Sequence, residues 1–211
     1  MHHASRVILA SSSPFRSDLL AATGLVFSSM TARINESDIS PSEPRQCALD
    51  RSIAKARDVA SINPECIVIG ADQVLEFNGQ AMGKVRSQLE AKERLEMLSG
   101  RTHLLWSAYC LLFKPANGDV IELYSDAVRI PMEMKELSSG EIEAYLRRKD
   151  QWQGVVGCYK YEELGGQLFL SVGGDHSSII GLPIMPLMTA IRRFGINPLI
   201  QPKGPWPLTL D

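Results

Sequence analysis

The sequence predicts an α/β fold, and three observations support this class. Short apolar runs typical of buried strands alternate along the chain with segments whose apolar residues recur at helical spacing. The chain has 211 residues, of which 45% are hydrophobic and 22% charged, so it can bury a sizeable core. Residues from about 100 to 165 are rich in strand-forming types. We therefore expect a single domain over residues 1–211 with two lobes and a cleft between them.

The N-terminal part reads as a strand, a serine-rich turn and a helix. Residues 6–10 (RVILA) are a short apolar run that predicts a buried strand. Ser13 is a good N-cap, Pro14 is a good first helical residue, and Gly24 is a natural stop. Residues 28–44 are polar and without periodicity, which predicts mostly loop.

The remaining elements are predicted from periodicity and turn signals. Residues 66–77 begin as a continuous apolar strand and then alternate, and Asn78-Gly79 is a strong hairpin turn signal. Ser138 and Glu141 have the spacing of a capping box at the start of a helix. The other predictions are helices over 45–60, 87–99 and 183–194, a hairpin over 103–113 and 120–131, short strands over 80–84 and 167–172, and a surface tail from residue 197.

Composition excludes several classes of protein. Lys and Arg number 22 against 24 Asp and Glu, a net charge of −2, so bulk positive charge for nucleic-acid binding is missing. No apolar run approaches the roughly 20 residues that span a bilayer. The first apolar stretch is also shorter than the roughly 7–15 residues of an export signal. The four cysteines form no CxxC pair. We expect a cytoplasmic protein with reduced thiols that binds neither nucleic acid nor membrane.

The turn after the first strand is a candidate anion site. A strand that runs into a helix N-terminus leaves backbone N–H groups free, and the helix dipole favours negative charge there. Ser11 and Ser13 add hydroxyl donors, and Arg16 lies one turn into the helix as a bidentate phosphate partner. Taken alone, the same residues also fit an ordinary Ser-Pro helix cap.

Asp72 is the main candidate for acid–base or metal chemistry. It follows the apolar run 67–69, so its carboxylate is expected at a strand end, where it could hold a metal or activate water. Lys55, Lys84 and Glu36 are further charged candidates. Taken alone, each of these four residues is more typical of a solvated surface position.

Glu162 is a candidate residue for recognising the nucleobase of a ligand. It lies in the segment YKYEELGG (159–166), where the chain can turn sharply beside a carboxylate. A carboxylate can accept two N–H bonds from the edge of a guanine. A charged surface loop is the alternative interpretation. His103 and His176 stand singly, which makes a histidine metal site improbable.

Four blocks of the sequence, in order from about residue 6 to 195, resemble the motifs of one known family. ILASSSPFRSDLL is similar to the family's LASxSPRRxxLL, and INESD to its acidic loop. The most specific block, IGADQVLEFNGQAMGKVRSQLEAKERLEMLSGRTH, resembles the run ADTVV…GKP…LSGRTH. GGDHSSIIGLPI is similar to the C-terminal GLP segment. Together these blocks resemble the Maf family of nucleoside triphosphate pyrophosphatases.

This resemblance implies an elongated mixed sheet with flanking helices and a cleft between two lobes. It also implies house-cleaning hydrolysis of a nucleoside triphosphate to the monophosphate and pyrophosphate, aided by Mg²⁺ or Mn²⁺. Asp72 falls on the family's proposed proton acceptor. We expect the phosphates to be held by Ser11, Ser13, Arg16, Lys55 and Lys84, and the metal by Glu36 and Asp72. A homodimer is a further expectation.

Three departures from the common family pattern point to the substrate. Phe15, Gln73 and Glu162 stand where many members have Arg, Thr and Gln, and all three occur in a subgroup that looks like the 7-methyl-GTP pyrophosphatases. An aromatic ring can stack on a methylated guanine, which is cationic, and gain a cation–π interaction. The alternatives are a pyrophosphatase for dTTP or UTP, one for ITP or XTP, and a non-catalytic nucleotide-binding regulator of septum formation.

Overall fold

One curled mixed sheet forms the frame of the molecule. The computed structural model describes residues 4–39, 43–200 and 206–207. The strands lie in the order β2-β1-β3-β5-β6-β7, with β4 paired to β3 and β8 paired to β1. Their bounds are β1 Ala4–Ala10, β2 Ser28–Ser29, β3 Cys66–Phe77, β4 Gln80–Met82, β5 Thr102–Phe113, β6 Ile121–Met134, β7 Phe169–Val172 and β8 Trp206–Pro207.

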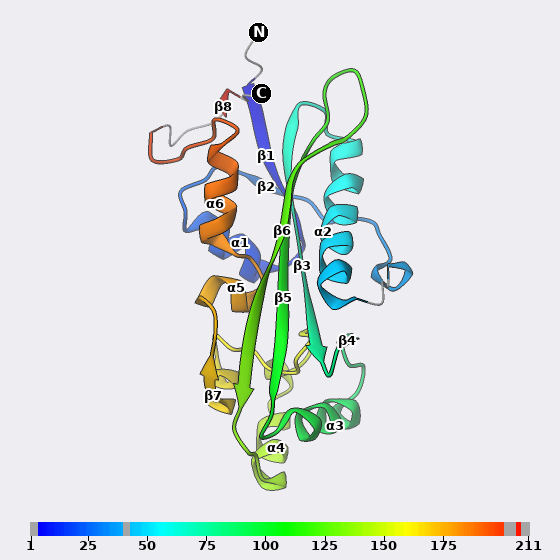
Figure 1. Cartoon of the computed structure of the whole chain (residues 1–211), viewed down its shortest axis with the longest axis vertical. Helices are drawn as coiled ribbons and strands as arrows, with labels where there is room; N and C mark the ends of the chain where they lie inside the picture. Colours follow the sequence, from blue (N-terminus) through cyan, green and yellow to red (C-terminus); the bar gives the residue numbers. More distant parts are fainter. Residues whose placement is uncertain (1–3, 40–42, 201–205, 208–211) are drawn as a thin grey trace.

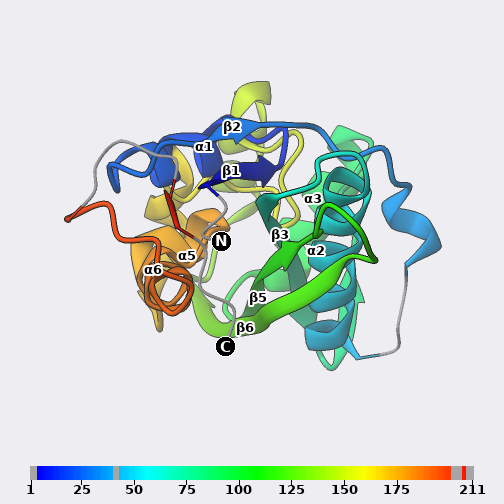
Figure 2. The same ribbon diagram turned by 90° about the horizontal axis from the view of Figure 1, so that it is seen from above.

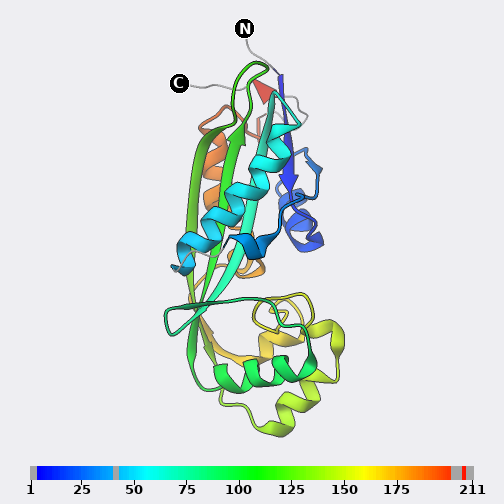
Figure 3. The same cartoon turned by 90° about the vertical axis from the view of Figure 1, so that its right-hand side faces the viewer.

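The helices gather at the two ends of the long β5–β6 pair, which runs the length of the molecule (Figure 1). At one end, α2 covers one side of the sheet and α1 and α6 lie on the other (Figure 2). At the other end lie α3 and α4 (Figure 3). The bounds are α1 Pro14–Ala21, α2 Pro44–Ser61, α3 Gln88–Leu98, α4 Ser139–Leu146, α5 His176–Ile180 and α6 Ile184–Arg192, with 3-10 turns at Glu36–Asp38, Lys149–Gln151 and Leu164–Leu168.

Each end of the sheet has its own apolar core, built on the same strands. Ile69 of β3 and Leu111 of β5 belong to the core under α1 and α6. Leu75 of β3 and Leu105 of β5 belong to the core under α3 and α4. The α/β class with a mixed sheet and flanking helices is therefore confirmed.

The local signals explain most element boundaries. The Ser13 Oγ accepts a hydrogen bond from the Arg16 amide at 3.4 Å and starts α1. Ser138 and Glu141 form both bonds of the capping box at the start of α4. The β3–β4 turn has Asn78 and Gly79 at φ 52° and 77°, the left-handed conformation that this dipeptide favours.

Helix α2 packs unusually close to β3 at Gly70. A Cβ atom there would lie 2.2 Å from the Ser52 carbonyl oxygen, 2.7 Å from the Cys110 Sγ and 2.9 Å from the Ala56 Cβ. Only glycine allows this approach. The approach brings Lys55 of α2 to Asp72 of β3, as described below.

Several boundaries differ from the predictions. The predicted loop 28–44 contributes β2, which pairs parallel with β1, and the 3-10 turn at Glu36–Asp38. Tertiary pairing, not local pattern, decides such a two-residue strand. Helix α5 was not predicted at all, and the strand predicted over 167–172 begins at Phe169 after a 3-10 turn. In the predicted surface tail, Trp206–Pro207 pairs with β1, whereas 201–205 and 208–211 lie outside the described residues.

Over the described part of the chain, no helix has the length and apolar character needed to cross a membrane.

Candidate functional site

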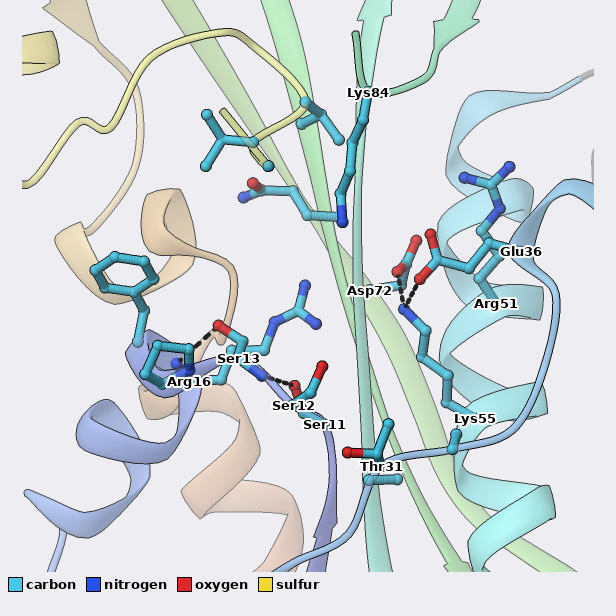
Figure 4. Close-up of a pocket in the computed structure, with 18 of the residues that line it drawn as sticks. Ser11, Ser12, Ser13, Arg16, Thr31, Glu36, Arg51, Lys55, Asp72 and Lys84 are labelled. Atoms are coloured by element: carbon cyan, nitrogen blue, oxygen red, sulfur yellow. Dashed lines mark hydrogen bonds and ion pairs between the residues drawn. The ribbon is translucent and has the colours of Figure 1, made fainter. Parts of the chain in front are cut away.

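A cavity of about 470 Å³ opens where β1 ends beside β3. The parallel pairing of these strands stops at Ala10 and Gly70, so the following residues of β3 border the cavity. The serine turn enters from one side and α2 from the other (Figure 4). Segments that are distant in the sequence therefore meet at one end of a strand.

Lys55 links two carboxylates on the α2 side of this cavity. Its Nζ lies 2.5 Å from the Asp72 Oδ1 and 2.7 Å from the Glu36 Oε1 (Figure 4). The Lys55 side chain is only 12% exposed. Asp72 is buried, and its Oδ2 has no hydrogen-bond partner among the described residues. Asp72 therefore has one carboxylate oxygen fixed by an ammonium group and one oxygen unpaired.

The positive charge around Glu36 outweighs its desolvation. Partial burial alone would raise the pKa of this carboxyl, but the hydrogen bond from Lys55 and the charges of Lys55, Lys84 and Arg51 lower it overall. Glu36 is therefore held as a carboxylate beside Asp72. The Glu36 carboxylate, the Asp72 carboxyl group and several cations share one polar space.

The serine turn and Arg16 form the opposite wall. The Ser11 Oγ accepts from the Ser13 amide at 3.1 Å, which leaves the Ser11 hydroxyl proton free to donate elsewhere. Arg16 is anchored to the backbone through Nε to the Gly181 oxygen at 2.9 Å and Nη1 to the Ala71 oxygen at 3.0 Å. Desolvation lowers the pKa of Arg16, and Asp72 and Glu36 act in the opposite direction. The anchoring fixes the guanidinium, so that it presents mainly Nη2 to a ligand.

A second cavity of about 50 Å³ adjoins the first and contains the three residues expected to select the base. Phe15 and Gln73 line both cavities, whereas Glu162 lines only the smaller one. The Gln73 Nε2 donates to the carbonyl oxygens of Ser178 and Ile179 at 3.2 and 2.9 Å. Because both partners are acceptors, the amide orientation is settled, and the Gln73 oxygen is the atom left for a ligand.

The chain was compared with known protein families and with curated proteins. The model of the family described as Maf-like protein matches residues 6–194. A nucleoside triphosphate pyrophosphatase of Nitrobacter hamburgensis is 40% identical over 195 residues, which cover 90% of this chain and 94% of that protein. The 7-methyl-GTP pyrophosphatases of Cupriavidus pinatubonensis and Bartonella henselae are 37% and 38% identical; the matches cover 90% and 92% of this chain and 94% and 98% of those proteins.

The chain belongs to the Maf-like protein family. The matched segment of this Maf-like chain includes every residue that lines either cavity. The larger cavity brings together nine of the predicted site residues, namely Ser11, Ser13, Phe15, Arg16, Glu36, Lys55, Asp72, Gln73 and Lys84. Of these, Lys84 is exposed at the rim. The roles predicted for these residues and for Glu162 stay predictions.

Five further polar or charged residues of the Maf-like site were missed in the sequence, namely Ser12, Thr31, Arg51, Gln153 and Lys160. Arg51 lies four residues before Lys55, so it shares a face of α2, and that spacing was the available signal. Its Nε donates to the Ile39 carbonyl oxygen at 3.0 Å, which ties the segment after Glu36 to α2. Gln153 and Lys160 carry no local signature.

The carboxylates of this Maf-like site suit a hard divalent cation that has few protein ligands. Within residues 4–39, 43–200 and 206–207 there is no group of three or more His, Cys, Asp and Glu side chains that could hold a metal alone. The unpaired Oδ2 of Asp72 and the carboxylate of Glu36 supply two oxygen donors. Mg²⁺ commonly takes one or two carboxylates and completes its shell with water and substrate phosphate.

Proposed function

We propose that this chain hydrolyses a nucleoside triphosphate to the nucleoside monophosphate and pyrophosphate, with 7-methyl-GTP as the preferred substrate. The observation that carries the proposal is the pair of adjoining cavities. The larger holds the unpaired oxygen of Asp72 among cations, and the smaller holds Phe15, Gln73 and Glu162. A triphosphate and a base need these two environments side by side. The names of the relatives agree with this activity.

The cationic and hydroxyl groups of the larger cavity would bind the phosphates. Phosphoryl transfer depends mainly on positioning and on stabilising the charge that develops on the phosphate oxygens. Arg16 is anchored to the backbone, so it meets the ligand without reorganising. Lys55 and Lys84 face it from the other side, and the hydroxyls of Ser11 and Ser13 add donors.

Asp72 is suited to orient and deprotonate the attacking water. One of its oxygens is held by Lys55, so the unpaired Oδ2 is the atom available to accept the proton. The water oxygen bonds to the α-phosphorus, the bond from this phosphorus to the bridging oxygen breaks, and the electron pair leaves with pyrophosphate. A divalent cation would be held by Glu36 and by the second lone pair of the Asp72 Oδ2, the first lone pair serving the water, and would neutralise phosphate charge.

The smaller cavity favours a base with hydrogen-bond donors on its edge. The Gln73 oxygen and the Glu162 carboxylate are both acceptors, because the Gln73 nitrogen is already used by two carbonyl groups. Guanine presents N1–H and an exocyclic amine, whereas thymine and uracil present one N–H between two carbonyl oxygens. Phe15 offers a ring face to a cationic purine.

Cytoplasmic residence and a homodimer are parts of the same proposal. All four cysteines are free thiols, which supports a reducing compartment.

The test is pyrophosphate release from a panel of 7-methyl-GTP, GTP, dTTP, UTP, ITP and XTP with Mg²⁺ or Mn²⁺. We expect the highest kcat/KM for 7-methyl-GTP. Asp72→Asn should lower turnover by a factor of about 10²–10⁴, because a positioned acid–base group is lost. Lys55 keeps Glu36 as its partner, so the variant should still fold.

Asp126→Asn is the matched control, because Asp126 pairs with Arg45 and lines neither cavity. Near-normal turnover in Asp72→Asn would remove Asp72 from the mechanism. A preference for dTTP or UTP, or for ITP or XTP, would overturn the choice of base. Nucleotide binding without pyrophosphate release would favour a non-catalytic regulator.

A further inference from the structure

Arg94 of α3 joins two segments that border the larger cavity and lie far apart in the sequence. Its Nη1 donates to the Gly83 carbonyl oxygen at 3.1 Å and to the Val156 carbonyl oxygen at 2.9 Å. Gly83 directly precedes Lys84, and Val156 lines both cavities. Arg94 itself lines neither cavity. One side chain behind the site therefore ties the segment of a phosphate ligand to the loop after α4.

The two hydrogen bonds of Arg94 use one nitrogen without competing. A guanidinium Nη carries two N–H groups, so one can go to each carbonyl oxygen. Arg94 is half-buried, and its helix is anchored in the apolar core through Leu95 and Leu98. Val156 packs against the same core. Because the helix and the loop are both fixed by packing, Gly83 is the partner whose position depends on Arg94.

Lys84 lies on a segment that has little packing of its own. Gly83 and Lys84 are both exposed, and a Cβ at Gly83 would meet nothing within 4 Å. The next residue, Val85, packs against the core. Lys84 is therefore placed between two fixed points, the Gly83 carbonyl group and the Val85 side chain, and extends into the cavity from there (Figure 4). A ligand group that is held in place before binding loses less conformational freedom on binding.

We propose that Arg94 is a positioning residue, which holds Lys84 in place for the triphosphate. This inference rests on the proposed function, because the role of Lys84 as a phosphate ligand is part of it. A direct electrostatic effect of Arg94 on the triphosphate would be different, since it would act whether or not Lys84 is present. A purely structural role of Arg94 would lower activity by the same factor with and without the Lys84 ammonium.

The test is a double-mutant cycle between Arg94→Met and Lys84→Met, measured as kcat/KM for pyrophosphate release from GTP and from 7-methyl-GTP. The factor by which Lys84→Met lowers kcat/KM should be at least about threefold smaller in Arg94→Met than in the wild type, because a lysine that is no longer positioned contributes less. Arg94→Gln has a shorter side chain that does not bridge the two carbonyl groups, so it should give the same result as Arg94→Met.

Two control variants accompany this cycle. Ser11→Ala removes a hydroxyl group on the opposite wall of the larger cavity, so its effect should be the same with and without Arg94. Lys92→Met removes another cation of α3, which pairs with Glu143 and lines neither cavity, and it should leave kcat/KM unchanged.

The same cycle on the binding of inorganic tripolyphosphate, measured by calorimetry, separates this inference from the proposed function. Tripolyphosphate binding requires neither a base nor turnover, and Lys84→Met should again weaken it by a smaller factor in Arg94→Met. A smaller factor in a protein that releases no pyrophosphate would overturn the proposed function and support the role of Arg94.

Two other outcomes would overturn the inference. Equal factors for Lys84→Met with and without Arg94 would mean that Arg94 does not position Lys84. Wild-type kcat/KM and wild-type tripolyphosphate binding in Lys84→Met would remove Lys84 from the phosphate ligands, and the role of Arg94 with it.

Discussion

At the scale of single residues, His103 is a buried group whose protonation is coupled to unfolding. Its Nε2 lies 2.6 Å from the Tyr159 hydroxyl, and its Nδ1 is buried with no partner among the described residues. Phe169 packs beside it, with ring centroids 5.9 Å apart. Burial lowers the pKa of His103 from 6.5 to about 4. The folded protein therefore keeps a neutral imidazole at pH values where the unfolded chain binds a proton.

Acid should destabilise the fold through this residue. The unfolded state takes up the proton below pH 6.5 and the folded state only near pH 4, so the free energy of unfolding falls between these values. We expect His103 to account for a loss of about 2 kcal/mol between pH 7 and pH 4.5. Urea unfolding of the wild type and His103→Gln at both pH values measures this contribution.

The comparison with His103→Gln separates the histidine from the carboxylates, which titrate in both proteins. The variant should lose less stability than the wild type over the same interval, because it has no imidazole to charge. Equal losses in the two proteins would contradict the role assigned to His103.

Residues with a local signature were predictable from the sequence, and residues placed by packing were not. Ser13 stood before a proline at a helix start, and Asp72 followed an apolar run. The expected strand end was wrong for Asp72, which lies within β3 and pairs with Ala108 of β5; the strand that ends beside it is β1. Arg51 and Lys160 reach the cavity only through the course of α2 and of the loop that holds Glu163. The spacing of Arg51 from Lys55 was a weak signal for a shared face of α2, whereas Lys160 has no pattern that separates a cavity wall from a solvated surface.

At the scale of elements, the contact between α2 and β3 sets the distance between Lys55 and Asp72. Gly70→Ala should destabilise the protein by about 1–3 kcal/mol, because the new methyl group would overlap the Ser52 carbonyl oxygen. It should also lower turnover, since α2 can relieve the overlap only by moving Lys55 away from Asp72. Thermal or urea unfolding and pyrophosphate release measure the two effects.

Gly140→Ala in the first turn of α4 is the matched control, because a Cβ there meets nothing within 4 Å. It should leave turnover unchanged and stability equal or slightly higher. If Gly70→Ala behaves like Gly140→Ala, the close approach of α2 has no energetic or functional importance.

Helices and strands were predicted well where a regular apolar pattern extended over many residues. They were predicted poorly where pairing with a distant strand determines the structure. The strand over 66–77 and the capping box of α4 were both confirmed. Helix α5 spans only five residues, too few for a periodic pattern, although Asp175 caps it and Gly181 ends it in the left-handed conformation. Those two residues were the signal that could have revealed it.

At the scale of the whole molecule, the larger cavity joins both ends of the sheet. Its walls include the serine turn and α2 from one end and residues 153–156 from the loop after α4. The arrangement of strands into one curled sheet was available only through the family resemblance, because pairing between distant segments leaves no local trace. A ligand in this cavity contacts parts that have separate apolar cores.

A bound nucleotide should therefore stabilise both ends together. A non-hydrolysable analogue of 7-methyl-GTP at about 100 times its Kd should raise the free energy of unfolding by about 2.7 kcal/mol. Hydrogen exchange should slow in residues 11–16 and in 153–162, which line the cavities from the two ends. Protection confined to one of the two cavity segments would contradict a ligand that spans them.

Asp72 and Gln73 are neighbours on β3, so one peptide unit separates the acid from an acceptor at the base pocket. Consecutive side chains of a strand point to opposite faces, and here the cavity reaches both faces past the end of β1. Any substitution of Gln73 that bends the backbone of β3 therefore also displaces the Asp72 carboxylate. Diversification of the accepted nucleobase, in evolution or in the laboratory, should therefore proceed first through Glu162, because its loop carries none of the residues assigned to hydrolysis.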